Sequence, residues 1–258
     1  MNLGAMRREI VKSATLANEG HIPSALSILE IVATFYSDVM NVELIRENSP
    51  DRDRFILSKG HGSLALYSVL AEVGLMDPAE LARFCSLEGI LGGHPDRCKV
   101  PCVEASTGSL GHGLPMATGL AMSLKRRSSS ARVYVLVGDG ECNEGSIWEA
   151  TMLASHMRLA NLLCVVDYNH SGDRALELGD LVKKFEAFGW SSVAISGHDQ
   201  LELATALKKV EHERPVAVIA NTIKGYGLKE MENNPAWHHA APSAEQLINF
   251  IIELDENA

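Results

Sequence analysis

Residues 133–169 decide the fold, reading V-Y-V-L-V-G-D-G-E-C-N-E-G from Val133 and closing with L-L-C-V-V-D-Y-N at Asn169. The run Val133–Val137 is short, apolar and β-branched, which predicts a buried parallel strand. Apolar residues then recur at helical spacing from Glu144 to Met157, and a second apolar run covers Leu162–Val166. The stretch therefore predicts two parallel strands joined by one crossover helix. Strands connected in this way are often neighbours in the sheet.

Polar side chains follow both of these strands. Asp139 stands between Gly138 and Gly140, and Asn169 comes just past the second run. Open α/β sheets bind ligands at the carboxyl ends of their strands. Magnesium prefers octahedral oxygen ligation and takes few protein carboxylates, so Asp139, Asn169 and the backbone carbonyl of Ser171 are the predicted ligands. The two glycines would let the backbone approach a diphosphate closely.

A plainer interpretation is that G-D-G forms an ordinary turn with a helix-capping aspartate, because short glycine motifs give many false matches. The asparagine after the next strand, at this separation, argues against that interpretation.

G-D-G followed at a distance by an asparagine resembles the metal-diphosphate motif of thiamine diphosphate enzymes. Further motifs narrow the resemblance to the transketolase family: A-N-E-G-H at 17–21, S-K-G-H-G at 58–62, G-G-H-P-D at 92–96, T-G-S-L-G-H-G at 107–113, K-G-Y-G at 224–227 and W-H-H-A-A-P at 237–242. They occur in the family's order along nearly the whole chain. The resemblance implies thiamine diphosphate bound together with Mg²⁺, or with Ca²⁺ or Mn²⁺ in its place.

The resemblance also assigns residues to roles. His21, His61 and His94 would line the substrate channel, together with His238 or His239. Counting from Trp237 favours His238, whereas counting back from Pro242 favours His239; we favour His238. The implied cofactor-binding residues are His61, Gly108, Ser109, Leu110, Gly138, Asp139, Gly140, Glu141, Asn169, Lys224 and His238.

Three charged residues near these motifs are open to more than one interpretation. Glu141 and Glu144 could be first-turn acids favoured by a helix dipole. The resemblance instead places Glu144 in a buried acid network at the interface with a partner half. We predict that Glu141 either lies on the surface or contacts residues that bind the cofactor. Lys59 could be a phosphate ligand, but we predict a solvated loop cation.

Two departures from the family pattern affect the site. The first loop reads G-H-I-P where relatives more often have G-H-P-G. The loop after Asn169, which would supply the carbonyl ligand from Ser171, is shorter than in most relatives and lacks a glutamine often found there.

Strands and helices alternate along the chain, which predicts an α/β fold with a doubly wound parallel sheet and helices on both faces, the thiamine diphosphate-binding fold. The 258 residues suffice for one such domain. The expected helices are Leu3–Ala17, Ser24 or Ser27 to Met40, Leu64–Val73, Leu114–Lys125, Leu181–Gly189, Gln200–Glu211 and Ala244–Leu254. The further expected strands are Arg54–Leu57, Val193–Ile195 and Pro215–Ala220, and Cys85–Thr107 is expected to form a long loop.

Composition excludes several classes of function. A formal net charge of -10 argues against nucleic acid as a partner. No apolar run approaches the length of a membrane span, and no signal-peptide core follows the first basic residues. Five cysteines are most simply reduced thiols, so we expect a cytoplasmic protein.

Taken with the resemblance, these features predict the N-terminal subunit of a split transketolase. Such an enzyme transfers a two-carbon ketol unit from a ketose, or ketose phosphate, to an aldose. A C-terminal partner subunit would supply the glutamate that activates the cofactor, in an α₂β₂ assembly. Alternatives are a deoxyxylulose-phosphate synthase, the first component of a 2-oxo acid dehydrogenase, a non-catalytic cofactor-binding module, or a specialised sugar route. The channel histidines favour transketolase over the dehydrogenases.

Overall fold

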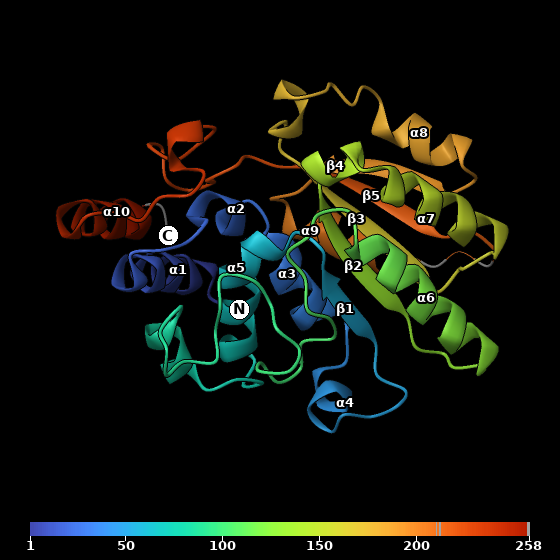
Figure 1. Cartoon of the computed structure of the whole chain (residues 1–258), viewed down its shortest axis with the longest axis horizontal. Helices are drawn as coiled ribbons and strands as arrows, with labels where there is room; N and C mark the ends of the chain where they lie inside the picture. The colour runs from blue at the N-terminus through green and yellow to red at the C-terminus, as the bar shows by residue number, and fades with distance from the viewer. Residues whose placement is uncertain (210, 212, 257–258) are drawn as a thin grey trace.

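The computed structural model describes residues 1–209, 211 and 213–256. Its centre is a parallel sheet with the strand order β1-β2-β3-β5-β4 (Figure 1). The strands are β1 Arg54–Leu57, β2 Val133–Gly138, β3 Leu162–Tyr168, β4 Ser191–Ser196 and β5 Val216–Asn221. The predicted neighbours β2 and β3 do pair, with Val133 opposite Leu162.

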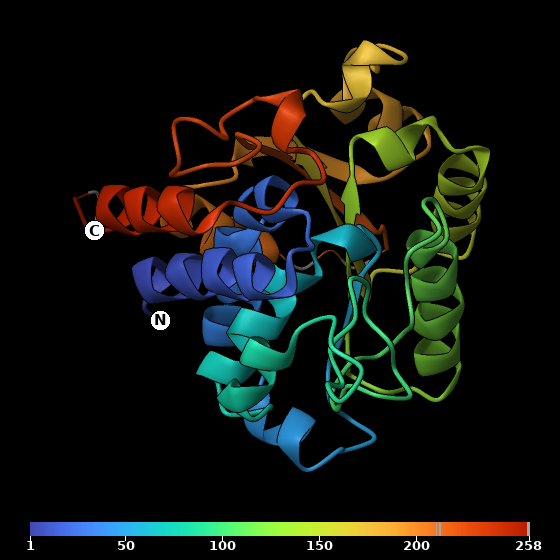
Figure 2. The same ribbon diagram turned by 60° about the vertical axis from the view of Figure 1, so that its left-hand side comes forward.

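Helices cover both faces of this sheet, as predicted for a doubly wound fold. On one face lie α6 Gly113–Arg126, α7 Gly145–His156 and α8 Leu181–Ala187. The other face carries α1 Leu3–Ala17, α2 Ile22–Leu26, α3 Leu29–Thr34, α5 Ser63–Glu72, α9 Gln200–Leu207 and α10 Ala244–Glu256. A short helix, α4 Val42–Arg46, precedes β1. Figure 2 shows α1 and α10 side by side, away from α6 and α7.

The strand sequences explain why helices cover both faces of the sheet. Along β2, Val133, Val135 and Val137 pack into one apolar cluster, whereas Tyr134 and Leu136 pack into the other. Because successive side chains point to opposite faces, a strand that is buried on both sides needs a continuous apolar run. The run read from the sequence has this property.

Two helix predictions were wrong. The helix expected from Ser24 or Ser27 to Met40 begins earlier, at Ile22, and is interrupted before Leu29. Pro23 occupies its first turn, where proline is tolerated. Ser27 is the C-cap residue of α2 and not the N-cap of the next helix, and its hydroxyl donates to a buried carboxylate.

The second error concerns α9, which ends at Leu207 and not at Glu211. By contrast, residues 85–107 form the long loop that was predicted. Within the described ranges, no helix combines the length and the apolar character that a membrane crossing requires.

Candidate cofactor site

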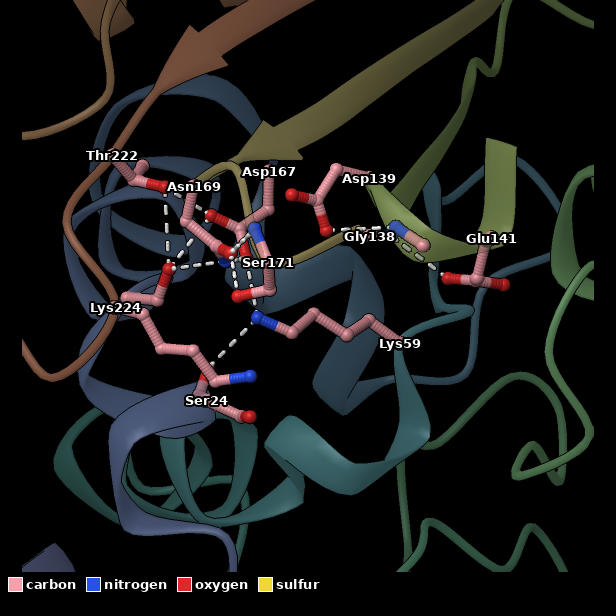
Figure 3. Close-up of polar contacts among 12 residues, drawn as sticks. Ser24, Lys59, Gly138, Asp139, Glu141, Asp167, Asn169, Ser171, Thr222 and Lys224 are labelled. Atoms are coloured by element: carbon pink, nitrogen blue, oxygen red, sulfur yellow. Dashed lines mark hydrogen bonds and ion pairs between the residues drawn. The ribbon is translucent and has the colours of Figure 1, made fainter. Parts of the chain in front are cut away.

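The site lies at the carboxyl edge of the sheet, where four strands deliver polar residues to one place. Gly138 of β2 is directly opposite Asp167 of β3, so Asp139 and Asn169 emerge side by side (Figure 3). Lys59 follows β1, and Thr222 follows β5. The predicted meeting of Asp139 and Asn169 at one edge is consistent with this register.

Asp139 joins the loops that follow β2 and β3. Its Oδ1 accepts a hydrogen bond from Gly140 N at 2.7 Å, and its Oδ2 accepts one from Gly172 N at 3.2 Å. A Cβ atom on Gly172 would lie only 2.9 Å from Gly140 N, so this contact requires glycine. Burial raises the pKa of Asp139, although the Gly172 hydrogen bond opposes that rise. A cation at the carboxylate would favour its charged form.

The amide of Asn169 is held in one orientation. Its Nδ2 donates to Asp167 Oδ2 at 2.9 Å and to Ser27 Oγ at 3.2 Å. Its Oδ1 accepts from Ser171 N at 3.1 Å and also from the Ser171 hydroxyl. The amide oxygen therefore faces the loop after β3, which is the side from which a ligand would approach.

A cavity of about 180 Å³ opens between these loops. It is lined by Lys59, His61, Leu110, Gly138, Asp139, Gly140, Glu141, Asn169, Ser171, Gly172, Lys224 and His238. Most of the predicted cofactor-binding residues thus meet in one place. The exceptions are Gly108 and Ser109: Gly108 lies instead against the ring of His94, and Ser109 is exposed.

Five histidines from four separate loops gather beside this cavity. The ring centroid of His21 lies 5.3 Å from that of His61, 6.4 Å from His94, 5.5 Å from His238 and 4.5 Å from His239. Burial and the neighbouring His239 lower the pKa of His21 to about 4. Burial and the nearby Lys59 ammonium lower the pKa of His61 to about 2. Both rings are therefore neutral near pH 7.

The two candidate histidines of W-H-H-A-A-P have different surroundings. His238 lines the cavity, and its Nδ1 lies 3.0 Å from Lys224 Nζ. His239 lies against His21 and pairs through Nε2 with the carboxylate of Glu19. His238 is thus placed toward the cofactor pocket, and His239 toward the outer end of the histidine cluster.

The prediction that Lys59 is a solvated cation was wrong. Its side chain is only 3% exposed, and its Nζ pairs with Asp167 Oδ2 and donates to Ser24 O at 3.2 Å. A buried ammonium is stable only when it has a counter-ion and hydrogen-bond partners. Asp167 supplies that counter-ion from a strand that is distant in the sequence, so the local pattern around Lys59 gave no sign of it.

Of the two alternatives for Glu141, the surface position is contradicted, since the residue is 1% exposed, and the supporting position fits. Its Oε1 accepts from Ser58 Oγ at 2.5 Å and from Gly111 N at 2.9 Å, and its Oε2 accepts from Gly138 N at 2.9 Å. Gly111 has φ +81°, where glycine is favoured, and a Cβ there would clash with Glu144. Glu141 therefore ties three loops of the site together.

Glu144 is exposed in this chain and stands at the N-cap of α7 without a side-chain capping bond. The place expected for Glu144 in an acid network at the interface with a partner stays a prediction.

Sequence reasoning missed four residues of the site: Ser27, Asp167, Gly172 and Thr222. One signal was available for Asp167, which is a charged residue two positions before Asn169 and therefore on the same face of an otherwise apolar strand. The hydroxyls of Ser27 and Thr222 both donate to it. Nothing local in the sequence marks these two hydroxyls.

The donor set fits a metal diphosphate. Around the cavity, Asp139 offers a carboxylate, Asn169 offers an amide oxygen, and Lys59 and Lys224 offer ammonium groups. The backbone at Gly140 is open, since a Cβ there would meet nothing within 4 Å. Among the described residues, no three His, Cys, Asp or Glu side chains are grouped to hold a metal ion. A metal at Asp139 would therefore need further oxygens from Asn169, the backbone and the diphosphate, as magnesium commonly does.

Comparison with known proteins agrees with this arrangement. Residues 3–253 match the family described as "Transketolase, thiamine diphosphate binding domain". A protein of Actinobacillus succinogenes, named as one of the subunits of an apulose-4-phosphate transketolase, is 39% identical over 98% of this chain and 94% of its own length. The protein of the same name from Phocaeicola vulgatus is 35% identical over 97% of this chain and 91% of its own.

Solved structures give the same result. The transketolase of Leishmania mexicana superposes with a TM-score of 0.87 at 26% identity, over 98% of this chain. The matched region spans only 40% of the Leishmania chain.

Proposed function

The chain belongs to the transketolase family, to its thiamine diphosphate-binding domains, and from this premise we propose that it is the N-terminal subunit of a split transketolase. The observation that carries the proposal is the convergence of five histidines beside a cavity whose donors fit a metal diphosphate. A cofactor-binding module without catalysis would have no need of this cluster.

The diphosphate end of the cofactor would be held by this chain. Asp139, Asn169 and the carbonyl of Ser171 would bind Mg²⁺, and Lys224 would offset the remaining negative charge of the diphosphate. The chemistry that bound thiamine diphosphate supplies is an electron sink for breaking a carbon–carbon bond next to a ketone.

The histidines would act on the sugar. Because His21 and His61 are neutral near pH 7, their free ring nitrogens can accept hydrogen bonds from sugar hydroxyls. The rings of His94 and His238 both lie close to that of His21, with centroids 6.4 and 5.5 Å from it, and would exchange protons with the substrate oxygens.

A partner protein is the second part of the proposal. Two relatives match this chain over more than nine-tenths of their own length. Each is named as one subunit of a transketolase. Large apolar side chains are exposed at the cavity wall, by Leu110, and on α6 and α7, by Met116, Met152 and Leu153, as expected of a surface that another protein covers. We propose an α₂β₂ assembly in which Glu144 lies at the interface. A cytoplasmic location stays a prediction from the sequence.

The identity of the product tests the reaction. The chain and its partner are incubated with a ketose phosphate labelled with ¹³C at C1 and C2, together with an aldose acceptor, and the products are analysed by mass spectrometry. The names of the relatives make apulose 4-phosphate the first donor to try. Transfer of both labelled carbons to the acceptor supports transketolase. In a parallel incubation, carboxyl-labelled pyruvate or another labelled 2-oxo acid replaces the ketose phosphate, and release of its label as carbon dioxide would support one of the alternative enzymes.

A further inference from the structure

Asp167 is a buried charge with a complete set of hydrogen-bond partners, although the proposed reaction gives it no direct role. It is 0% exposed and lies at the end of β3, on the same face as Asn169. Its Oδ1 accepts hydrogen bonds from Ser27 Oγ at 2.7 Å and from the Thr222 hydroxyl. Its Oδ2 accepts from Lys59 Nζ and from Asn169 Nδ2, the latter at 2.9 Å (Figure 3).

These four donors fill the acceptor capacity of the carboxylate, because its two oxygens offer about four lone-pair sites. Asp167 therefore has no free lone pair for a metal ion, even though it lies two residues from Asn169. The neighbouring Asp139 differs in this respect, since only two backbone N–H groups occupy its carboxylate.

The hydrogen bonds to Asp167 also fix the orientation of the Asn169 amide. A carboxylate oxygen can only accept, so the group of Asn169 that faces Asp167 must be its NH₂. Ser27 Oγ, at 3.2 Å, holds the same NH₂ from a second direction. The amide oxygen is then left facing Ser171 and the cavity, which is the orientation that a hard metal ion needs.

From this geometry we infer that Asp167 is a positioning residue, which orients the amide oxygen of Asn169 toward the metal and holds Lys59 in the wall of the cofactor cavity. The inference rests on the proposed function, because it concerns the same metal diphosphate site. It also explains why an aspartate is buried at a position where the cofactor itself does not require one.

The test compares Asp167→Asn with Thr222→Val. Asp167→Asn keeps the shape of the side chain but removes two acceptor sites and the counter-ion of Lys59. Thr222→Val removes a donor to the other oxygen and leaves the Asp167–Asn169 bond in place. The chain, reconstituted with its partner, is titrated with Mg²⁺ in the presence of excess thiamine diphosphate, and cofactor binding is followed by calorimetry.

We expect the Mg²⁺ midpoint of Asp167→Asn to rise roughly 10–100-fold, as is usual when a residue behind a metal ligand is lost. Thiamine diphosphate binding should recover at saturating Mg²⁺, which a general loss of structure would not allow. Thr222→Val should raise the midpoint by a clearly smaller factor than Asp167→Asn, because the Asp167–Asn169 hydrogen bond and the Lys59 counter-ion both remain. A folded Asp167→Asn variant with the wild-type midpoint, or an equal shift in Thr222→Val, would overturn the inference.

Two further measurements keep the test decisive if Asp167→Asn does not fold. Ser27→Ala removes the second acceptor of the Asn169 NH₂ and leaves the Lys59–Asp167 pair intact, so its midpoint should rise by a smaller factor. A Ser27→Ala midpoint equal to that of Thr222→Val would contradict the inference. In the cofactor-free chain, the Asn169 NH₂ protons should exchange slowly with solvent by NMR, and fast exchange would contradict it as well. If the wild-type pair does not bind thiamine diphosphate at all, the proposed function fails and this inference fails with it.

Discussion

Lys224 Nζ lies 3.0 Å from Nδ1 of His238, at the point where the cofactor cavity meets the histidine cluster. An ammonium group can only donate, so Nδ1 must accept and His238 must carry its proton on Nε2. Partial burial and the charge of Lys224 both lower the pKa of His238, which keeps this ring neutral. In the proposed enzyme, the charge of Lys224 beside the diphosphate would thus set the tautomer that His238 presents to the sugar.

The first prediction concerns pH. Burial, with repulsion from Lys59, lowers the pKa of Lys224 to about 8, whereas a bound diphosphate would favour its charged form. Below pH 8 the ammonium is already present, so cofactor affinity should be constant. Above pH 8 binding must take up a proton, and affinity should fall about tenfold per pH unit. Calorimetry at several pH values measures this slope, and Lys224→Met should remove it. A wild-type affinity that does not change between pH 7 and 9 would contradict the assignment of Lys224.

The second prediction concerns the metal. Asp139→Ala should abolish magnesium-dependent thiamine diphosphate binding, because it removes a carboxylate that lines the cavity and accepts only two backbone hydrogen bonds among the described residues. Loss of one partner in a buried, charged contact costs about 2–5 kcal/mol. Glu88→Ala, which changes an exposed loop carboxylate, is the matched control. Unchanged cofactor affinity in Asp139→Ala would disprove the proposed metal site.

The third prediction concerns the histidines. His61→Ala, His94→Ala and His238→Ala should each lower kcat/KM by roughly 100-fold or more, as loss of a proton-transfer group commonly does. Their unfolding transitions should stay near that of the wild type, since all three lie in loops outside the apolar clusters. His156→Ala, at the exposed end of α7, should retain activity. Normal turnover by all three variants with the true donor would rule out the channel arrangement.

The fourth prediction concerns the contact between the two ligand loops. Gly172→Ala would place a Cβ 2.9 Å from Gly140 N and force the loops apart, which should cost about 1–3 kcal/mol in the free energy of unfolding. Gly119→Ala provides the control, because a Cβ there meets nothing within 4 Å and the residue lies inside α6. That change should stabilise the chain by about 0.5–1 kcal/mol. Urea unfolding measures both, and equal midpoints for the two variants would refute the close contact.

The part of the fold that could be predicted from the sequence is the part fixed by short-range periodicity. The apolar runs of β2 and β3 located both strands, and their ends located Asp139 and Asn169. The meeting of five histidines could not be derived from spacing, because they come from loops far apart in the sequence; only the family resemblance brought them together.

The wrong prediction for Lys59 and the wrong surface alternative for Glu141 have one physical cause. Lys59 and Glu141 were read from their own segments, where a charged residue beside glycine usually faces solvent. In the structure their partners, Asp167 and Ser58, come from other strand ends and convert both positions into buried, hydrogen-bonded charges. Tertiary pairing of this kind leaves no local trace in the sequence.

The central claim is that this chain supplies half of a transketolase active site. The most direct measurement is donor-ketose-dependent ketol transfer by the purified chain, by its partner protein, by the two together, and by the partner with the Asp139→Ala chain, each with thiamine diphosphate and Mg²⁺. We expect activity only in the wild-type mixture, because in the proposed split enzyme this chain would hold the diphosphate and the partner would supply the activating glutamate. Full activity from the single chain, or an Asp139→Ala mixture as active as the wild type, would contradict the account.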